Sequence, residues 1–384
     1  MRAAAPSRAS KAETIRAFVP APPDVWLFGS VATLVAIGLI MIFSASSAQA
    51  YADHRDTAYY VKHQAVYLAV GLFLAYFAYK IDYRKLRALA PYALVLCIGS
   101  LAAVLVPHIG VSVNGAKRWI GGGAISLQPS EFAKLGLVLY LSAVLSMRAD
   151  QIKSLSRGLF PVLLVTGLMA GLVFAEPDMG TASLLVFTAF AMLFAAGARI
   201  EHLIAVILVT LPPTILMVLT SPYKRARIFA FINPWKDPQN TGFHIVQSLL
   251  ALGSGGLTGV GAGESRAKFF YLPEQYTDFI FSVLGEEFGL AGTMAVVILF
   301  LFFAYRAIRI AIAAPDRFGF FLASGCAALI TIQAFVNIGV VTSSWPVTGV
   351  PLPFISFGGS SLIVCLLCVA LIMNVGRFRR VNLE

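Results

Sequence analysis

The segment FIFSVLGEEFGLAGTMAVVILFLFFA, residues 279–304, decides the class of fold. About 20 consecutive apolar helical residues cross a lipid bilayer, and this segment is longer than that. Val25–Ser47 has the same character. Over the whole chain, 59% of the residues are hydrophobic and 12% are charged, whereas about a quarter of a soluble domain is charged. The sequence therefore predicts an all-α polytopic membrane protein.

The hydropathy pattern predicts about ten spans, with one large loop between the seventh and the eighth at about residues 221–278. Ten spans put both termini on one side of the membrane, and 18 of the 29 Lys and Arg residues fall on that side. Because positive residues concentrate on the cytoplasmic side, the termini are predicted to be cytoplasmic and the large loop extracytoplasmic. The predicted spans are Val25–Ser47, Gln64–Tyr79, Leu89–Val106, Glu131–Met147, Leu159–Ala175, Thr181–Gly197, His202–Thr220, Phe279–Ala304, Phe318–Ser343 and Ser360–Val375.

The chain is expected to have three parts. Residues 1–24 form a flexible cytoplasmic tail, residues 25–376 form the transmembrane domain, and residues 377–384 form a short basic cytoplasmic tail. A net charge of +11 would suggest a nucleic-acid partner for a soluble protein. Here the positive-inside rule accounts for the charge, so no nucleic acid is expected as a partner.

Acidic residues are scarce in the chain, and four of its 18 carboxylates lie within residues 270–289, around the predicted start of span eight. Thr277 is expected to cap the helix of span eight, which places Asp278 in the first turn, where the helix dipole favours an ionised carboxylate. Such a carboxylate at a water-accessible boundary suits a general base, and the alternative is simple compensation of the dipole. If the helix extends back past Pro273, Glu274 lies on the same face as Asp278.

Two further acids, Glu286 and Glu287, are predicted to lie well inside span eight. A charge at that depth costs several kcal/mol unless it is paired or hydrated. These side chains must therefore be protonated, bound to a buried cation, or placed along a cavity. The alternative to a functional role is a structural one, in which they hold helices together.

Residues 114–136 carry polar chemistry towards the same outer side of the membrane. Lys117 and Arg118 are candidates for binding phosphate. Gln128, Glu131 and Lys134 follow where the chain enters span four. The spacing of Glu131 and Lys134 predicts a local ion pair.

Two more polar segments are expected on the outer side. In residues 175–182, Glu176 and Asp178 interrupt two apolar spans, and residues 345–363 contain three prolines and three glycines that prevent a regular helix. Irregular backbone at membrane depth is tolerated where it lines a cavity. The convergence of these segments with Asp278 predicts an active site, and the basic residues beside acids suggest a diphosphate-bearing lipid substrate.

The glycine-rich stretch GSGGLTGVGAG, residues 253–263, follows a predicted helix over residues 241–252. It is no P-loop, because it follows no strand and has no Lys followed by Ser or Thr at its end. Two interpretations remain. The stretch is either a tightly turned connector or a place where backbone N–H groups approach a phosphate-bearing substrate.

Several of these segments together resemble the signature blocks of the bacterial SEDS family, the shape, elongation, division and sporulation proteins of the FtsW, RodA and SpoVE type. The resemblance covers nearly the whole chain after the first 24 residues, and five blocks occur in order. The blocks are NGAKRWI with QPSEFAKL, EPDMGTA, INPWKDPQNTGFHIVQSLLALGSGGLTGVG, FFYLPEQYTDFIFSVLGEEFGLAG and PLPFISFGGSSL.

The resemblance implies an inverting peptidoglycan glycosyltransferase that polymerises lipid II outside the cytoplasmic membrane, with undecaprenyl diphosphate as the leaving group. The essential carboxylate of the family matches Asp278, which is implied to deprotonate the acceptor hydroxyl. Many relatives have His just before this block, and Tyr276 stands here instead, so an Asp–His dyad is not expected. The matched positions implied to line the substrate cavity are Lys117, Arg118, Gln128, Glu131, Lys134, Glu274, Ser360 and Ser361.

The resemblance also implies partners and a place in the cell. A class B penicillin-binding transpeptidase is expected to crosslink the glycan product, together with other membrane proteins of the division or elongation machinery. A divalent cation such as Mg²⁺ is compatible with this chemistry, although no spacing in the sequence defines a metal site. The blocks AKFFYLPEQYTDFIF at residues 267–281 and FSASSAQAY at residues 43–51 favour the division branch and hence the septum, whereas residues 346–362 read closer to the elongation branch.

Two other classes of function compete with the polymerase. A lipid II flippase would also need about ten spans, buried acids and broken helices, but no inverted repeat is evident in the sequence. A scaffold that only recruits transpeptidases would not need acids within the membrane. Glycan synthesis from lipid II by the purified protein would separate these possibilities.

Overall fold

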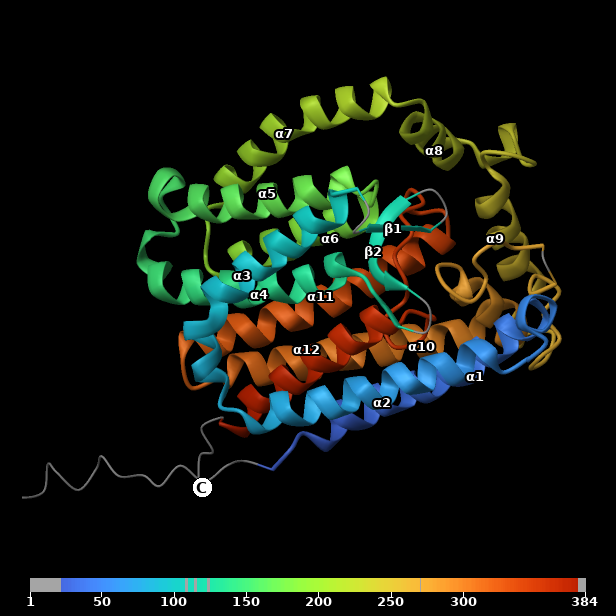
Figure 1. The fold of residues 1–384 in the computed structure, drawn as a ribbon, viewed down its shortest axis with the longest axis horizontal. Helices are drawn as coiled ribbons and strands as arrows, with labels where there is room; N and C mark the ends of the chain where they lie inside the picture. Colours follow the sequence, from blue (N-terminus) through green and yellow to red (C-terminus); the bar gives the residue numbers. More distant parts are fainter. Residues whose placement is uncertain (1–21, 108–109, 114–115, 123–124, 270, 379–384) are drawn as a thin grey trace, which may run out of the picture.

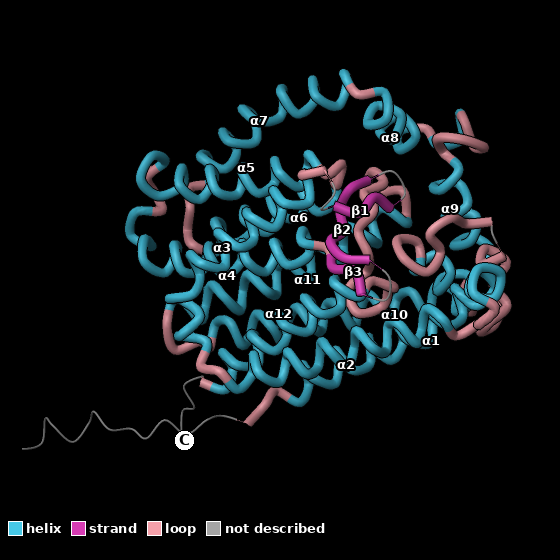
Figure 2. The backbone as a smooth tube through the Cα atoms, in the orientation of Figure 1, coloured by secondary structure: helices cyan, strands magenta, loops and turns pink. Residues whose placement is uncertain are grey.

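The computed structural model describes residues 22–107, 110–113, 116–122, 125–269 and 271–378. Most of the two predicted tails, residues 1–21 and 379–384, lies outside this part. Long helices run roughly side by side, with a small sheet near one end of the bundle (Figures 1 and 2). The prediction of an all-α polytopic membrane protein is confirmed.

Each predicted span coincides with a helix of the described chain. Eight apolar helical stretches are long enough to cross a membrane, while α6 and the first part of α7, Ile200–Pro213, are shorter apolar helices. The largest differences from the predicted bounds are at the ends of α1 and α10, which both continue further. The helices are α1 (Val25–His54), α2 (Tyr59–Lys80), α3 (Tyr83–Leu105), α4 (Pro129–Arg148), α5 (Phe160–Ala175), α6 (Met179–Ala195), α7 (Ile200–Thr220), α10 (Ile280–Ile312), α11 (Arg317–Val341) and α12 (Gly359–Arg377).

Burial separates a core helix from lipid-facing ones. In α12, 89% of the spanning stretch is buried inside the protein, against 11% in α2. The core helix α12 packs against α2, α4, α10 and α11. Exposed apolar side chains on the outer helices, such as Phe73 and Leu96, are what a bilayer would solvate.

The loop between α7 and α10 is largely structured. It contains α8 (Pro222–Ile232), the short 3₁₀ helix η5 (Pro234–Lys236) and α9 (Phe243–Ser254). The helix predicted over residues 241–252 is thus confirmed as α9. Two further short helices, η3 (Ala149–Gln151) and η4 (Leu155–Leu159), connect α4 to α5.

The glycine-rich stretch after α9 packs against a break in α10. At Gly289 the backbone has φ 64°, so α10 consists of two helical pieces. The Val260 N–H donates to the Glu286 carbonyl (3.0 Å), and the Leu290 N–H donates to the Gly256 carbonyl (2.9 Å). A Cβ on Gly259 would lie 2.1 Å from the Glu287 carbonyl oxygen, so only glycine fits there. The stretch is therefore a tightly turned connector, and these N–H groups contact protein carbonyls.

The sequence analysis did not predict the three-stranded antiparallel sheet that precedes α4. Its strands are β1 (Gly110–Val113), β2 (Ala116–Gly122) and β3 (Ile125–Leu127), in the order β1-β2-β3. Trp119 pairs with Val111, and Ile120 pairs with Leu127. Strands of three to seven residues carry too little alternation to be recognised beside long apolar helices.

Candidate active site

Asp278 lies in a turn before α10 and not within its first helical turn. The helix begins at Ile280 with Phe279 as its N-cap, so the prediction that Thr277 caps this helix is wrong. Glu274 has a φ of 55°, and no helix extends back to it. Its carboxylate accepts a hydrogen bond from the Thr277 hydroxyl at 2.8 Å. The two acids therefore belong to one compact turn.

Side chains from far along the chain hold this turn in place. The Asn337 amide donates to the carbonyl oxygens of Asp278 and Val350, both at 2.7 Å. The Ser356 hydroxyl donates to the Thr277 carbonyl at 2.5 Å. Such bonds to backbone carbonyls explain why residues 274–279 do not join the helix. They also tie Asp278 to the irregular segment before α12.

The Asp278 carboxyl is half-buried among charges of both signs. Its pKa is raised to about 7, first by burial and then by the negative charges of Glu274 and Asp178. Arg227 and Arg118 act in the opposite direction. A carboxyl with a pKa near neutrality is partly ionised at physiological pH and can accept a proton.

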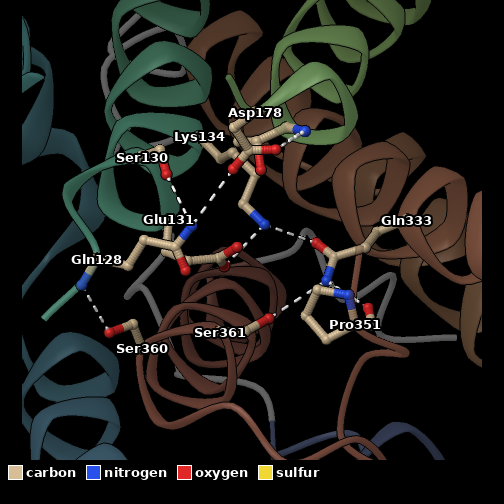
Figure 3. A network of polar contacts seen from close by, with 10 residues as sticks. Gln128, Ser130, Glu131, Lys134, Asp178, Gln333, Pro351, Ser360 and Ser361 are labelled. Atoms are coloured by element: carbon tan, nitrogen blue, oxygen red, sulfur yellow. Dashed lines mark hydrogen bonds and ion pairs between the residues drawn. The ribbon is translucent and has the colours of Figure 1, made fainter. Parts of the chain in front are cut away.

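A second contact set joins α4, α6 and α12 (Figure 3). The Gln128 backbone N–H donates to the Ser360 hydroxyl at 3.0 Å, and its side-chain amide lies 3.4 Å from an Asp178 carboxylate oxygen. The other Asp178 oxygen accepts from the Thr181 N–H at 3.0 Å and caps α6. Ser360 lies in the first turn of α12. Three segments that the sequence predicted to converge, residues 114–136, 175–182 and 345–363, therefore meet through Gln128, Asp178 and Ser360.

The predicted pair of Glu131 and Lys134 is confirmed, with 2.7 Å between carboxylate and ammonium. Both side chains are buried, at 3% and 1% exposure. The Lys134 ammonium also donates to the Gln333 side-chain oxygen at 2.8 Å. The Gln333 amide continues to the Ser361 hydroxyl at 3.2 Å and the Pro351 carbonyl at 2.9 Å, as Figure 3 shows. This chain of contacts fixes α4 to α11 and α12 directly beneath the irregular segment.

Arg118 on β2 reaches the turn between α5 and α6. Its guanidinium donates to the carbonyl oxygens of Glu176 (3.1 Å) and Pro177 (2.5 Å). The Glu176 carboxylate is buried, and neither of its oxygens has a hydrogen-bond partner among the described residues. Burial, followed by the charge of Asp178, raises the pKa of Glu176 to about 8, against a lowering effect of Arg118. This carboxyl is therefore mostly neutral at pH 7.

The structure thus brings together most of the predicted site residues at one end of the bundle. The Lys117 side chain lies outside what the structure describes, although its backbone pairs with Ser112 in the sheet. Gln333 and Asn337 were missed by the sequence analysis. The signal was present, because two amides four residues apart in an apolar span mark one polar face of a helix. The predicted residues that the contacts join to this end are Arg118, Gln128, Glu131, Lys134, Glu274, Asp278, Ser360 and Ser361.

A metal site is not evident from the side chains. Within the described part of the chain, no three His, Cys, Asp or Glu side chains are grouped so as to hold a metal ion. The use of a divalent cation stays a prediction.

Fold and site define a polytopic membrane protein with a carboxylate-bearing polar site at one end of its helices. The chain belongs to the family described as "Cell cycle protein", of the FtsW, RodA and SpoVE type, whose sequence model matches residues 25–381. This confirms the predicted family.

Relatives in sequence carry two kinds of name. "Stage V sporulation protein E" of Bacillus subtilis is 43% identical over 358 residues, covering 93% of this chain and 98% of the relative. "Probable peptidoglycan glycosyltransferase FtsW" of Geobacter metallireducens is 42% identical over 352 residues, covering 92% and 94%.

Solved structures share the fold. A chain of a peptidoglycan synthase complex, described for its coordination of polymerization and crosslinking, superimposes with a TM-score of 0.77 at 32% identity, covering 92% of this chain and 98% of that one. The rod shape determining protein RodA of Thermus thermophilus gives 0.69 at 30% identity, covering 94% and 98%. The protein is therefore a multi-pass protein of the cytoplasmic membrane.

Proposed function

We propose that this protein is a peptidoglycan glycosyltransferase that polymerises lipid II into glycan strands. Relatives of the same length carry that name, and the chain belongs to their family. The observation that carries the proposal is the half-buried Asp278 carboxyl, with a pKa raised to about 7, at the meeting point of four polar segments. A base of this kind is needed wherever a sugar hydroxyl becomes a nucleophile.

The proposed reaction uses Asp278 as general base. Its carboxylate takes the proton from the 4-hydroxyl of the acceptor GlcNAc as that oxygen forms a bond to C1 of the donor MurNAc. The bond from C1 to the phosphate oxygen breaks on the opposite face, so C1 is inverted and undecaprenyl diphosphate leaves with the electron pair. Attack and departure on opposite faces need one base and one stabilised leaving group.

Positive charge beside Asp278 would stabilise the negative charge of the diphosphate leaving group. Arg118 and Arg227 both act electrostatically on Asp278, so they lie close enough to stabilise a developing diphosphate charge. Lys117, on the same strand as Arg118, is proposed to contribute to this binding. A diphosphate has several acceptor oxygens, and arginine binds such groups with paired N–H donors.

The remaining site residues are proposed to shape the substrate cavity. Glu131 and Lys134 neutralise each other and reach Gln333, so they hold α4 against α11. Gln128 joins α4 to Ser360 at the start of α12. Through these contacts the base is kept at a fixed distance from the basic residues. Glu274 and Ser361 are proposed to complete the wall of the cavity around Asp278.

The proposed orientation places this end of the bundle outside the cytoplasm. Residues 1–24 and 377–384 would then be cytoplasmic tails of a transmembrane domain spanning residues 25–376, and the loop at about 221–278 would be extracytoplasmic. The excess of Lys and Arg on the side of the termini supports this orientation. Lipid II is proposed to be used at the outer face.

A class B penicillin-binding transpeptidase is the proposed partner, because a chain of the same fold was solved within a peptidoglycan synthase complex. Other membrane proteins of the division machinery are proposed to join them. The FtsW names of several relatives favour septal wall synthesis, and the likeness to RodA keeps an elongation role as the alternative.

The decisive experiment compares wild type with Asp278→Asn in lipid II polymerisation by purified protein with its cognate transpeptidase. Loss of a general base is expected to slow glycan synthesis roughly 10²–10⁴-fold while partner binding and folding are kept. Asp150→Asn is the matched control, because that side chain is 93% exposed beyond the other end of α4. Expression and binding of the partner are matched for all three proteins.

Each outcome has a distinct meaning. Equal synthesis by Asp278→Asn and wild type would overturn the base assignment, and Glu274 or Glu131 would be tested next. No synthesis by wild type, under conditions in which a control SEDS enzyme is active, would favour a lipid II flippase. The broken helix α10 is the structural feature compatible with that alternative.

A further inference from the structure

A cavity of about 360 Å³ lies at the end of the bundle opposite to Asp278. It lies where α4 ends and where α3 and α11 begin, whereas the start of α4 carries the site residues. None of its side chains takes part in the proposed polymerase chemistry. The lining residues are Arg84, Arg87, Ser146, Asp316, Arg317 and Phe318.

The lining is strongly positive. Three arginines face one carboxylate, which leaves an excess of two positive charges. The carboxylate, Asp316, is already engaged, because it accepts from the Gly319 N–H at 2.9 Å to cap α11 and from the Tyr83 hydroxyl. Arg84 contacts it through Nε at 3.5 Å. Asp316 therefore cannot neutralise all the arginines.

The other two arginines are weakly compensated. Arg317 has an ion pair of 3.7 Å with Asp150, whose side chain is 93% exposed, and such exposed pairs contribute little. Arg87 has no ion-pair or hydrogen-bond partner recorded among the described residues. Positive residues are common at the cytoplasmic ends of membrane helices. Their convergence on one cavity from two helices goes beyond that general bias.

The chemistry of the lining selects the class of ligand. Guanidinium groups with paired N–H donors are suited to the oxygens of a phosphate ester. The volume is within the range of small-ligand sites. Carboxylates and diphosphates share some of this chemistry, so the position of the cavity in the membrane decides between the ligands.

The position of the cavity points to a lipid. It lies at the ends of membrane-spanning helices, at the level where phospholipid headgroups meet the helix termini. Exposed apolar side chains near these helix ends, such as Leu89 (53%) and Met147 (69%), are what a bilayer would solvate, so acyl chains would surround the helices that carry the cavity. A lipid bound there could keep its acyl chains in the bilayer while its phosphate occupies the cavity. We propose that this cavity binds the phosphate group of an anionic phospholipid.

The test uses the full-length protein, stripped of lipid in detergent and titrated with phosphatidylglycerol. The double variant Arg87→Gln/Arg317→Gln removes two cavity charges and keeps Arg84, which also stacks on Phe378. Lys85→Gln/Lys153→Gln is the matched control, because it removes two exposed positive charges beside α3 and α4 that do not line the cavity. Native mass spectrometry counts bound lipid, and thermal melting verifies that all three proteins are folded.

We expect the cavity variant to bind phosphatidylglycerol at least about tenfold more weakly than wild type, since each lost guanidinium removes a charge-assisted hydrogen bond to the phosphate that is worth roughly a factor of ten. The control should stay within about twofold of wild type. An equal loss of affinity for phosphatidylglycerol in both variants would indicate general attraction to the surface charge and would overturn the proposal. Unchanged affinity in both variants would also overturn it.

A competition experiment distinguishes a lipid headgroup from a soluble phosphate ester as the ligand. Inorganic phosphate and glycerol phosphate are titrated as competitors of the lipid. The proposal expects them to displace phosphatidylglycerol only at much higher concentration, because they lack acyl chains. Tight binding of the soluble phosphates without binding of the lipid would overturn the assignment to a phospholipid and would identify a site for soluble phosphate esters.

Discussion

The half-buried carboxyl of Asp278 and the buried carboxyl of Glu286, eight residues apart in the chain, have very different surroundings in the fold. Glu286 accepts hydrogen bonds from the Ser265 hydroxyl (2.5 Å) and from the backbone N–H groups of Arg266 and Ala267 (3.1 Å each). Among the residues that the structure describes, Asp278 has no comparable set of donors, and its pKa is raised by burial and by other acids. The protein supplies the hydrogen bonds of the Glu286 carboxylate, whereas the Asp278 carboxylate remains able to accept a proton.

Glu287 belongs with Glu286 in this comparison. It accepts from the Ser44 hydroxyl at 2.5 Å and lies 3.8 Å from the Lys268 ammonium. The two acids thus hold α1 and residues 265–268, just after the glycine-rich connector, against α10, which is the structural alternative left open by the sequence. Glu176 belongs with Asp278, because it is buried without a hydrogen-bond partner among the described residues. The supply of hydrogen bonds therefore separates the carboxylates that the fold satisfies from those whose pKa it raises.

Among the tests of this contrast between Glu286 and Asp278, the Glu286→Ala change is expected to have the largest effect, and it acts on the stability of the fold. The change leaves one hydroxyl and two backbone N–H groups without their acceptor, so unfolding should become easier by about 3 kcal/mol or more. Thermal unfolding of the purified protein measures it. Glu264→Ala, an exposed acid in the same connector, should change the melting temperature little. Equal stability of both variants would break the comparison.

An intermediate effect is expected from pH acting on Asp278. With a pKa of about 7, the carboxylate is mostly protonated at pH 6 and mostly ionised at pH 8. A base works only when ionised, so the initial rate of glycan synthesis should rise about tenfold over this interval. Rates are measured with the folded fraction verified at each pH. A flat profile would contradict the role of Asp278 as the titrating base.

The smallest effect is expected from Glu176→Gln. Because the folded pKa is about 8 and the unfolded pKa is about 4.3, wild type loses stability as pH rises between these values. The neutral variant avoids this loss, so it should melt a few degrees higher than wild type at pH 8 and equally only at about pH 3.5, below both pKa values. Glycan synthesis at pH 7 should stay close to wild type. A lower melting temperature at pH 8 would show that the ionised form is stabilised.

The sequence predicted the spans well because long apolar runs have one physical solution in a membrane. It also predicted the ion pair of Glu131 and Lys134, since residues three apart on a helix are neighbours. The start of α10 was placed too early, because the bonds that hold Thr277 and Asp278 in a turn come from residues 59 and 79 positions away. Local patterns carry no information about such distant donors.

The Asn337 amide, which joins Asp278 to Val350, has a consequence for the order of synthesis. A ribosome makes the chain from its N-terminus, so Asp278 emerges long before Asn337 and Ser356, which hold its turn in place. Until α11 and α12 have been inserted, the carboxylate lacks the side chains that position it. The newly made protein therefore assembles its reactive centre only as the last step of membrane insertion, when all of its helices are already in place.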